Sequence, residues 1–229
     1  MRALLVLVAL LIAGVLAVRY LERTRPQDLP WTPLDLTAPV GFMTPLKLQM
    51  LRHSPARCEA ALARARIGYT PIPDRRVSEH CGYEGAVTLD RTRIRYAPTP
   101  VTMACPLAAA LVIWEREVAA PAARRRFGTE LARVQHYGIY NCRRLYGRSA
   151  GPYSEHATAD AMDVAAFYLA DGRQISVQRN WKDGTAEGDF LKDVHDGACR
   201  IFGTTLGPDY NAAHHDHFHL DMRGWRSCR

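Results

Sequence analysis

The chain has 229 residues, of which 48% are hydrophobic and 23% charged, and its formal net charge is +7. This composition is ordinary for a globular protein, and the length suffices for one domain plus an anchor. A basic chain fits either a solvated arginine-rich surface or attraction to nucleic acid, anionic lipid or anionic wall polymer. The run Arg124–Arg126 lacks the interleaved aromatic residues that a single-strand binder needs, so no nucleic-acid partner is expected.

Residues 1–23 are predicted to be a membrane anchor or signal segment, because an unbroken apolar run extends from Ala3 to Val18. The run is short for a spanning helix of about 20 residues, although a tilted helix can reach. It also fits the apolar core of a signal peptide. The flank from Arg19 to Arg23 lacks the small residues that signal peptidases prefer, and no cysteine follows for a lipoprotein anchor. We favour an uncleaved single-pass anchor, with a cleaved signal as the alternative.

Residues 24–54 are predicted to be a linker. Prolines recur along it: Pro26, Pro30, Pro33, Pro39 and Pro45. Such spacing prevents a long helix and favours a semi-extended tether. The tether would hold the folded part, residues 55–229, away from the membrane.

The sequence contains six cysteines: Cys58, Cys81, Cys105, Cys142, Cys199 and Cys228. None forms a Cys-x-x-Cys pair, which argues against a structural zinc knuckle. An even number of widely spaced cysteines after an export segment predicts up to three disulfides and a domain outside the cytoplasm. The sequence alone does not determine which cysteines form disulfides with one another. We expect the following three: Cys142 with Cys199, Cys58 with Cys81, and Cys105 with Cys228.

The first half of the domain is predicted to be mainly helical. A short amphipathic helix covers Cys58–Ala65, and a region of turns and strands follows. That region should bury four residues: Val77, Val87, Leu89 and Ile94. Pro106 stands at a favourable first position of a second helix, which should bury one stripe: Leu107, Leu111, Trp114 and Val118. Pro121 is expected to stop that helix and begin another, with its own apolar stripe: Phe127, Leu131 and Val134.

The second half is predicted to be richer in strands. Gly138–Arg143 reads as a strand, and Phe167–Val177 reads as a hairpin because Asp171-Gly172 separates two apolar runs. Apolar residues from Phe190 to Phe202 indicate a helix. Helices come first and strands later, so the predicted class is α+β, with a small antiparallel-rich sheet and flanking helices.

The last predicted strand is rich in histidine, from His214 to Asp221. Side chains at i and i+2 share a face of a strand, which would carry His215, His217, His219 and Asp221. The intervening Phe218 and Leu220 would pack into the core. Because neutral imidazole is the commonest protein metal ligand, this stretch reads as half of a zinc site.

The segment Ser154–Asp163 is predicted to supply the other half. It offers His156 and Asp163, and small residues at 157, 159 and 161 let the backbone curl so that the two converge. A catalytic zinc takes three N/O ligands and keeps a fourth position open. His156, Asp163 and one imidazole of the terminal motif satisfy that count. No His-Glu-x-x-His helix is present, which excludes the thermolysin type of peptidase.

The pattern Ser-x-His-x(6)-Asp followed by His-x-His resembles the LAS group of zinc peptidases, which includes D-Ala-D-Ala metallopeptidases and the hedgehog zinc domain. The chain is also similar to the bacterial extensin-like C-terminal domain family over most of residues 55–228. The matching segments are Cys105-Pro106, Cys142-Arg143, Ser154–Ala157, Gly197–Cys199, Leu206–Pro208 and His217–Asp221. The resemblance implies an exported, peptidoglycan-related domain with a hedgehog/D-Ala-D-Ala peptidase-like zinc fold.

The resemblance also implies roles for the histidines. His156, Asp163 and His219 would be the zinc ligands. His217 would hydrogen-bond the reacting water or the developing oxyanion, and His214 takes the place of a further active-site histidine in some LAS endopeptidases.

Three further residues complete the expected site. Arg143 would read a substrate carboxylate, although Asn141-Cys142-Arg143-Arg144 departs from the usual carboxypeptidase pattern, which leaves endopeptidase cleavage open. A salt bridge to a neighbouring acid is the alternative for this arginine. Ser154 would contact substrate or shape its loop, and Asp216 would orient an imidazole.

The expected function is a zinc-dependent peptidoglycan peptidase, monomeric, on the periplasmic side of the inner membrane. The alternative is a zinc-bearing wall-binding or scaffold protein without turnover. The pair His217 and His219 favours the hydrolase. A metal-dependent nuclease fits the positive charge but not export and disulfides.

Overall fold

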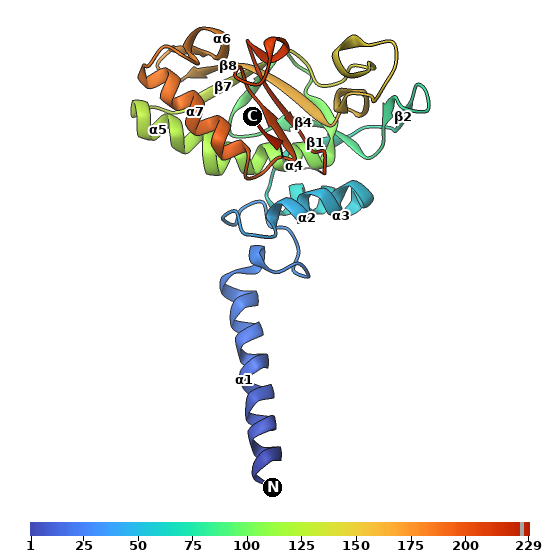
Figure 1. Cartoon of the computed structure of the whole chain (residues 1–229), viewed down its shortest axis with the longest axis vertical. Coiled ribbons are helices and arrows are strands. Elements are labelled where there is room, and N and C mark those ends of the chain that lie inside the picture. The colour runs from blue at the N-terminus through green and yellow to red at the C-terminus, as the bar shows by residue number, and fades with distance from the viewer. Residues whose placement is uncertain (225–226) are drawn as a thin grey trace.

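An apolar helix, α1 (Arg2–Thr24), projects from the rest of the chain and buries none of its residues (Figure 1). The computed structural model describes residues 1–224 and 227–229. The helix continues without a break through the polar flank at Arg19–Arg23. It is long and apolar enough to cross a membrane, with a mean hydropathy of 2.6 over its best 18-residue window. A signal sequence near an N-terminus passes the same test, so anchor and signal stay as the two alternatives.

Residues 26–53, which we call the cap, fold against the domain and do not form the expected extended tether. The cap contains one α-helix, α2 (Thr44–Met50), and two 3-10 turns, η1 (Pro26–Asp28) and η2 (Leu51–His53). Its prolines do prevent a long helix, but four leucines between and after them enter the core: Leu34, Leu36, Leu48 and Leu51. Burial of these side chains opposes an extended, solvated conformation.

The central helix of the domain begins at Cys105, close to the predicted start. It consists of α4 (Cys105–Trp114), a π-helical turn η3 (Glu115–Ala119) and α5 (Ala120–Phe127). The prediction that Pro121 stops this helix was wrong, because the wider π turn precedes Pro121 and accommodates its ring. The helix ends at Gly128, whose φ is +66°, and Leu131 and Val134 belong to the strand that follows. The predicted helix near Cys58 is confirmed as α3 (Pro55–Arg64).

A seven-stranded sheet forms the main layer, in the order β12-β10-β11-β8-β7-β5 with β9 paired to β8. Its strands are β5 (Arg95–Ala97), β7 (Leu131–His136), β8 (Ala161–Leu169), β9 (Gln174–Ser176), β10 (Thr204–Leu206), β11 (Phe218–Asp221) and β12 (Ser227–Cys228). The β5–β7 and β10–β12 pairs are parallel, and the other pairs of this sheet among the described residues are antiparallel. The predicted hairpin is confirmed by β8 and β9. Two helices complete this half: α6 (Val177–Asn180) and α7 (Ala186–Ala198).

The core joins this sheet to the helices. Trp114 of α4 packs against Phe167 of β8 and against Phe202, which follows α7. The α+β class predicted from the sequence is therefore confirmed, as a mixed fold of small sheets and helices.

Two smaller sheets occupy residues 68–104. One pairs β1 (Gly68–Pro71), β4 (Ala86–Arg91) and β6 (Thr102–Ala104), and the other pairs β2 (Arg75–Arg76) with β3 (Gly82–Tyr83). Val87, Leu89 and Ile94 are buried as predicted, but Val77 is exposed, so that prediction was wrong. The strand predicted over Gly138–Arg143 was also wrong, because this segment is irregular.

The three disulfides join Cys58 to Cys105, Cys81 to Cys142, and Cys199 to Cys228. All three expected pairings were wrong. The pairing is set by which helices and strands pack together, and this cannot be deduced from the spacing of the cysteines in the sequence. For example, α3 packs on α4, and β12 pairs with β10 beside the end of α7.

Glu115 is a carboxyl group buried in the π turn of the central helix. The Tyr96 hydroxyl donates a 2.6 Å hydrogen bond to Oε1 of Glu115. Burial raises the pKa of Glu115 to about 8, against an ordinary value of 4.5. Because the folded state holds this proton more tightly than the unfolded state, this group makes the fold less stable as pH rises from about 4.5 to about 8.

We expect Glu115→Gln to remove this pH dependence. The free energy of unfolding of the variant, minus that of the wild type, should grow by about 3–5 kcal/mol between these two pH values. Urea unfolding of the detergent-solubilised chain at a series of pH values measures it. Glu130→Gln, at an exposed carboxyl, is the control. Parallel curves for wild type and Glu115→Gln would contradict the prediction.

Candidate metal centre

The site begins with a cross-strand pair, in which Asp163 of β8 faces His219 of β11. Nδ1 of His219 lies 2.9 Å from Oδ1 of Asp163. The histidine-rich strand is shorter than predicted, because it starts at Phe218 and His214 ends a 3-10 turn, η6 (Ala212–His214). His215 is consequently exposed and lies outside the strand.

His156 reaches Asp163 from a tight turn that directly precedes β8. This 3-10 turn, η5 (Glu155–Thr158), is capped by Ser154, whose hydroxyl accepts a 3.3 Å hydrogen bond from the His156 amide. It closes at Ala159, which has a φ of +56°. Nε2 of His156 then lies 3.1 Å from Oδ2 of Asp163. The structure thus brings His156, Asp163 and His219 together, with one potential ligand atom of each within 4.8 Å of the others.

Hydrogen bonds on the far side of each ring assign the histidine tautomers. Nδ1 of His156 lies 2.7 Å from the Ile139 carbonyl oxygen, which can only accept, so Nδ1 carries the proton. Nε2 of His219 lies 3.0 Å from the carboxylate of Asp221 and likewise donates. When both rings are neutral, the nitrogens left without a proton are Nε2 of His156 and Nδ1 of His219, and both face the carboxylate of Asp163.

This convergence of lone pairs and negative charge suits a cation. Nε2 of His156 is buried and, although it lies 3.1 Å from Oδ2 of Asp163, it is not aligned for a hydrogen bond to that oxygen or to any other described residue. Two imidazole nitrogens and one carboxylate, each already oriented, are the donor set of a three-ligand zinc site. The residues present therefore fit the metal that the sequence predicts.

The pKa values of His219 and Asp163 also indicate that the site favours positive charge. Burial opposes charge on His219, yet the carboxylates of Asp163 and Asp221 raise its pKa to about 9. Burial also opposes charge on Asp163, but His156 and His219 hold the pKa of this carboxyl below its usual range. Positive charge is thus favoured among these three side chains.

His217 stands beside the three residues and is held by the predicted partner, Asp216. Its Nδ1 lies 2.8 Å from Oδ1 of Asp216. Its Nε2 lies 3.4 Å from Oδ1 of Asp163. Asp216 is able to reach the ring because both residues precede β11 and do not alternate across it.

His214 lies next to His217, with 5.2 Å between ring centroids. Its Nδ1 lies 2.8 Å from the side-chain oxygen of Asn211. Burial, together with the neighbouring His217 and His219, lowers the pKa of His214 to about 4. His214 is therefore a neutral ring at the edge of the site.

A cavity of about 390 Å³ opens onto these residues. Its wall includes Arg143, Tyr146, Ser154, Tyr210, His214 and Arg223. Within the described part of the chain Arg143 makes no ion pair, so the salt bridge considered for it is not formed there. Ser154 lines the cavity, but its hydroxyl caps the turn that carries His156.

Sequence reasoning missed two supports of the site. The first is Asp221, which accepts the Arg223 backbone N–H with one carboxylate oxygen and orients the His219 ring with the other. The i, i+2 alternation that relates these two residues was a usable signal. Arg52 of the cap pairs with Asp160 and Glu155, which flank the His156 turn, and no sequence signal pointed to this long-range contact.

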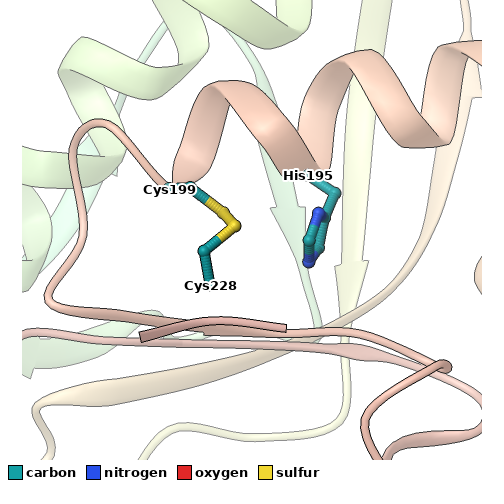
Figure 2. Close-up of side chains that lie close together, drawn as sticks. All are labelled: His195, Cys199 and Cys228. Carbon is teal, nitrogen blue, oxygen red and sulfur yellow. A yellow bond between two sulfur atoms is a disulfide. The ribbon is translucent and has the colours of Figure 1, made fainter. Parts of the chain in front are cut away.

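A second group of potential ligands, His195, Cys199 and Cys228, does not form a metal site. Figure 2 shows that the two sulfur atoms are joined in a disulfide beside the imidazole. Neither sulfur is available as a thiolate ligand. His195 instead contacts Asp196 and the Arg229 carbonyl oxygen, at 3.0 and 3.1 Å.

Comparison with known proteins places the chain in a family. No curated protein and no solved structure is significantly similar to it. A family model described as the extensin-like protein C-terminus matches residues 56–229, well over half of the chain. The match begins where the sequence predicts the folded domain to start and includes all three candidate metal ligands. The chain belongs to the extensin-like C-terminal domain family.

Proposed function

We propose that the protein is a zinc-dependent hydrolase of amide bonds in peptidoglycan stem peptides or crosslinks, exposed on the outer face of the inner membrane. The convergence of His156, Asp163 and His219 beside an open cavity carries the proposal. The motif resemblance to LAS peptidases supplies the substrate class.

Nε2 of His156, the carboxylate of Asp163 and Nδ1 of His219 would hold the ion. When bound, zinc supplies Lewis acidity toward a water molecule and a substrate carbonyl. The Ile139 carbonyl and Asp221 keep the two rings oriented, so ion binding needs no rotation of either side chain.

His217 is the residue that we assign to proton transfer. Asp216 holds Nδ1 of the ring, which leaves Nε2 directed toward the ligand group. At that position Nε2 can accept a proton from an attacking water or stabilise a developing oxyanion. Arg143, which has no ion-pair partner in the described residues, offers a planar donor pair to a substrate carboxylate at the cavity wall.

The alternative is a zinc-bearing wall-binding or scaffold protein. One observation favours it: Nε2 of His217 lies only 3.4 Å from Oδ1 of Asp163. If His217 joined the other three residues as a fourth ligand, the site would be closed, which is typical of structural zinc. The two functions therefore differ in what His217 does.

Digestion of defined muropeptides by the detergent-solubilised chain tests the function. Chromatography with and without a chelator should reveal products that disappear when zinc is removed and return when it is added. Intact muropeptides together with a stoichiometric zinc content would favour the scaffold.

We expect His156→Ala and His219→Ala each to lower the zinc content of the purified chain severalfold, because each removes one of three ligands. Atomic absorption measures the stoichiometry. His53→Ala, at an exposed histidine of the cap, should retain wild-type zinc. Unchanged zinc in both ligand variants would refute the ligand assignment.

Asp221→Asn should weaken zinc binding by about 10–100-fold, because the His219 ring loses the carboxylate that fixes its tautomer. Competition with a fluorescent chelator measures the affinity. Asp196→Asn is a matched control, since Asp196 makes the same kind of contact to His195 outside the site. Equal affinities for the two variants would contradict the prediction.

His217→Ala should keep its zinc and lose muropeptide cleavage by about 10²–10⁴-fold, as expected for loss of a general acid–base group. Zinc content and product formation are measured on the same preparation. Full activity would remove the catalytic role, whereas loss of zinc would make His217 a ligand.

A further inference from the structure

The cap exposes a hydrophobic stripe on the side opposite to its packed face. Phe42, Leu46 and Met50 follow one another at intervals of four residues, so they share one side of α2 and its entry turn. They are 84%, 44% and 49% exposed. In the same helix Leu48 is buried in the core, and Lys47 is buried within the cap, where its ammonium group donates to the Pro26 carbonyl and to Thr32. Exposed apolar side chains that adjoin one another in this way are typical of an interaction site.

The stripe starts at the end of α1. The Phe42 amide donates a 2.7 Å hydrogen bond to Oδ1 of Asp28, in the turn that directly follows α1. Trp31 also lies beside the end of α1, since its indole N–H donates to Oε1 of Glu22 at 3.1 Å. The Trp31 side chain is nevertheless 60% exposed. The cap lies between α1 and the rest of the domain, with α2 crosswise to α1 (Figure 1).

The charge and length of α1 identify the occupant. Arg19, Arg23 and Arg25 are exposed where α1 meets the cap, and tryptophan with basic residues at the end of an apolar helix is typical of a membrane interface. The apolar run from Ala3 to Val18 is about 24 Å long at 1.5 Å per residue, shorter than the roughly 30 Å hydrocarbon core. Because the apolar length of α1 is shorter than the hydrocarbon core, the polar end of α1 and the adjoining cap are held close to the headgroups.

We propose that the cap is a membrane-contacting collar. Its exposed side chains enter the headgroup region of the leaflet that α1 leaves: Trp31, Phe42, Leu46 and Met50. The three arginines favour anionic phospholipid there. The collar holds the domain at the surface in one orientation, which a flexible tether would not do. The proposal depends on α1 being retained and does not depend on the zinc site.

The experiment uses the full chain in vesicles of phosphatidylcholine and phosphatidylglycerol whose acyl chains are brominated near the headgroup. Bromine quenches tryptophan only at short range, and Trp114 and Trp181 are buried in the domain. We expect quenching in the wild type and loss of the quenched component in Trp31→Phe. The difference between the two chains isolates Trp31 whatever the other tryptophans contribute.

A triple variant, Phe42→Ser with Leu46→Ser and Met50→Ser, should reduce the quenching of Trp31, because the collar no longer enters the interface. Val77→Ser, at an exposed valine outside the cap, should leave it unchanged. Circular dichroism checks that each variant is folded.

Three outcomes would overturn the proposal. The first is equal quenching in the wild type and in Trp31→Phe. The second is a mature chain that mass spectrometry shows to lack α1. The third is an unquenched Trp31 together with a dimer that the triple variant dissociates, which would make a second copy of the chain the occupant.

Discussion

The candidate metal centre depends on the register between β8 and β11. Asp163 and His219 meet only because these strands pair with the two residues directly opposite each other. A slip by one residue would turn His219 into the core and Phe218 toward the cavity. Phe218 and Leu220 are fully buried on the other face of the same strand, so hydrophobic burial holds the register that the ligands require. The core and the site are thus specified by one alternating pattern.

The supports of the site extend well beyond the ligands. Asp221 and the Ile139 carbonyl fix the two rings, and Ser154 fixes the turn that carries His156. Arg52 pairs with the buried Asp160 behind that turn although it comes from the cap, outside the family match. Removing one partner of a buried ion pair is costly. The cap is therefore coupled to the candidate metal centre as well as to the end of α1.

Some of this could be predicted from the sequence. The candidate ligands lie in short motifs whose local geometry follows from i, i+2 alternation and from a turn of small residues. The hairpin at Asp171-Gly172 and the helix near Cys58 are local in the same way. The predictions that failed depend on long-range contacts. Leu36 and Leu48 enter the core, so the predicted linker packs against the domain, and the disulfide pairing follows from how the helices pack. The prediction that Pro121 ends the helix failed for a different reason, because the π turn before it accommodates the proline ring.

The disulfide connectivity has a consequence for how the chain matures. Cys58 pairs with Cys105 and Cys81 with Cys142, so the first two bonds interleave along the sequence. For a chain that emerges from a translocation pore beginning at its N-terminus, Cys58 and Cys81 are the first thiols to meet an oxidant. Immediate oxidation would join the wrong partners, and correct maturation requires either delayed oxidation or a reshuffling catalyst. Cys199 and Cys228 follow each other among the cysteines, so oxidation in the order of emergence can pair them correctly.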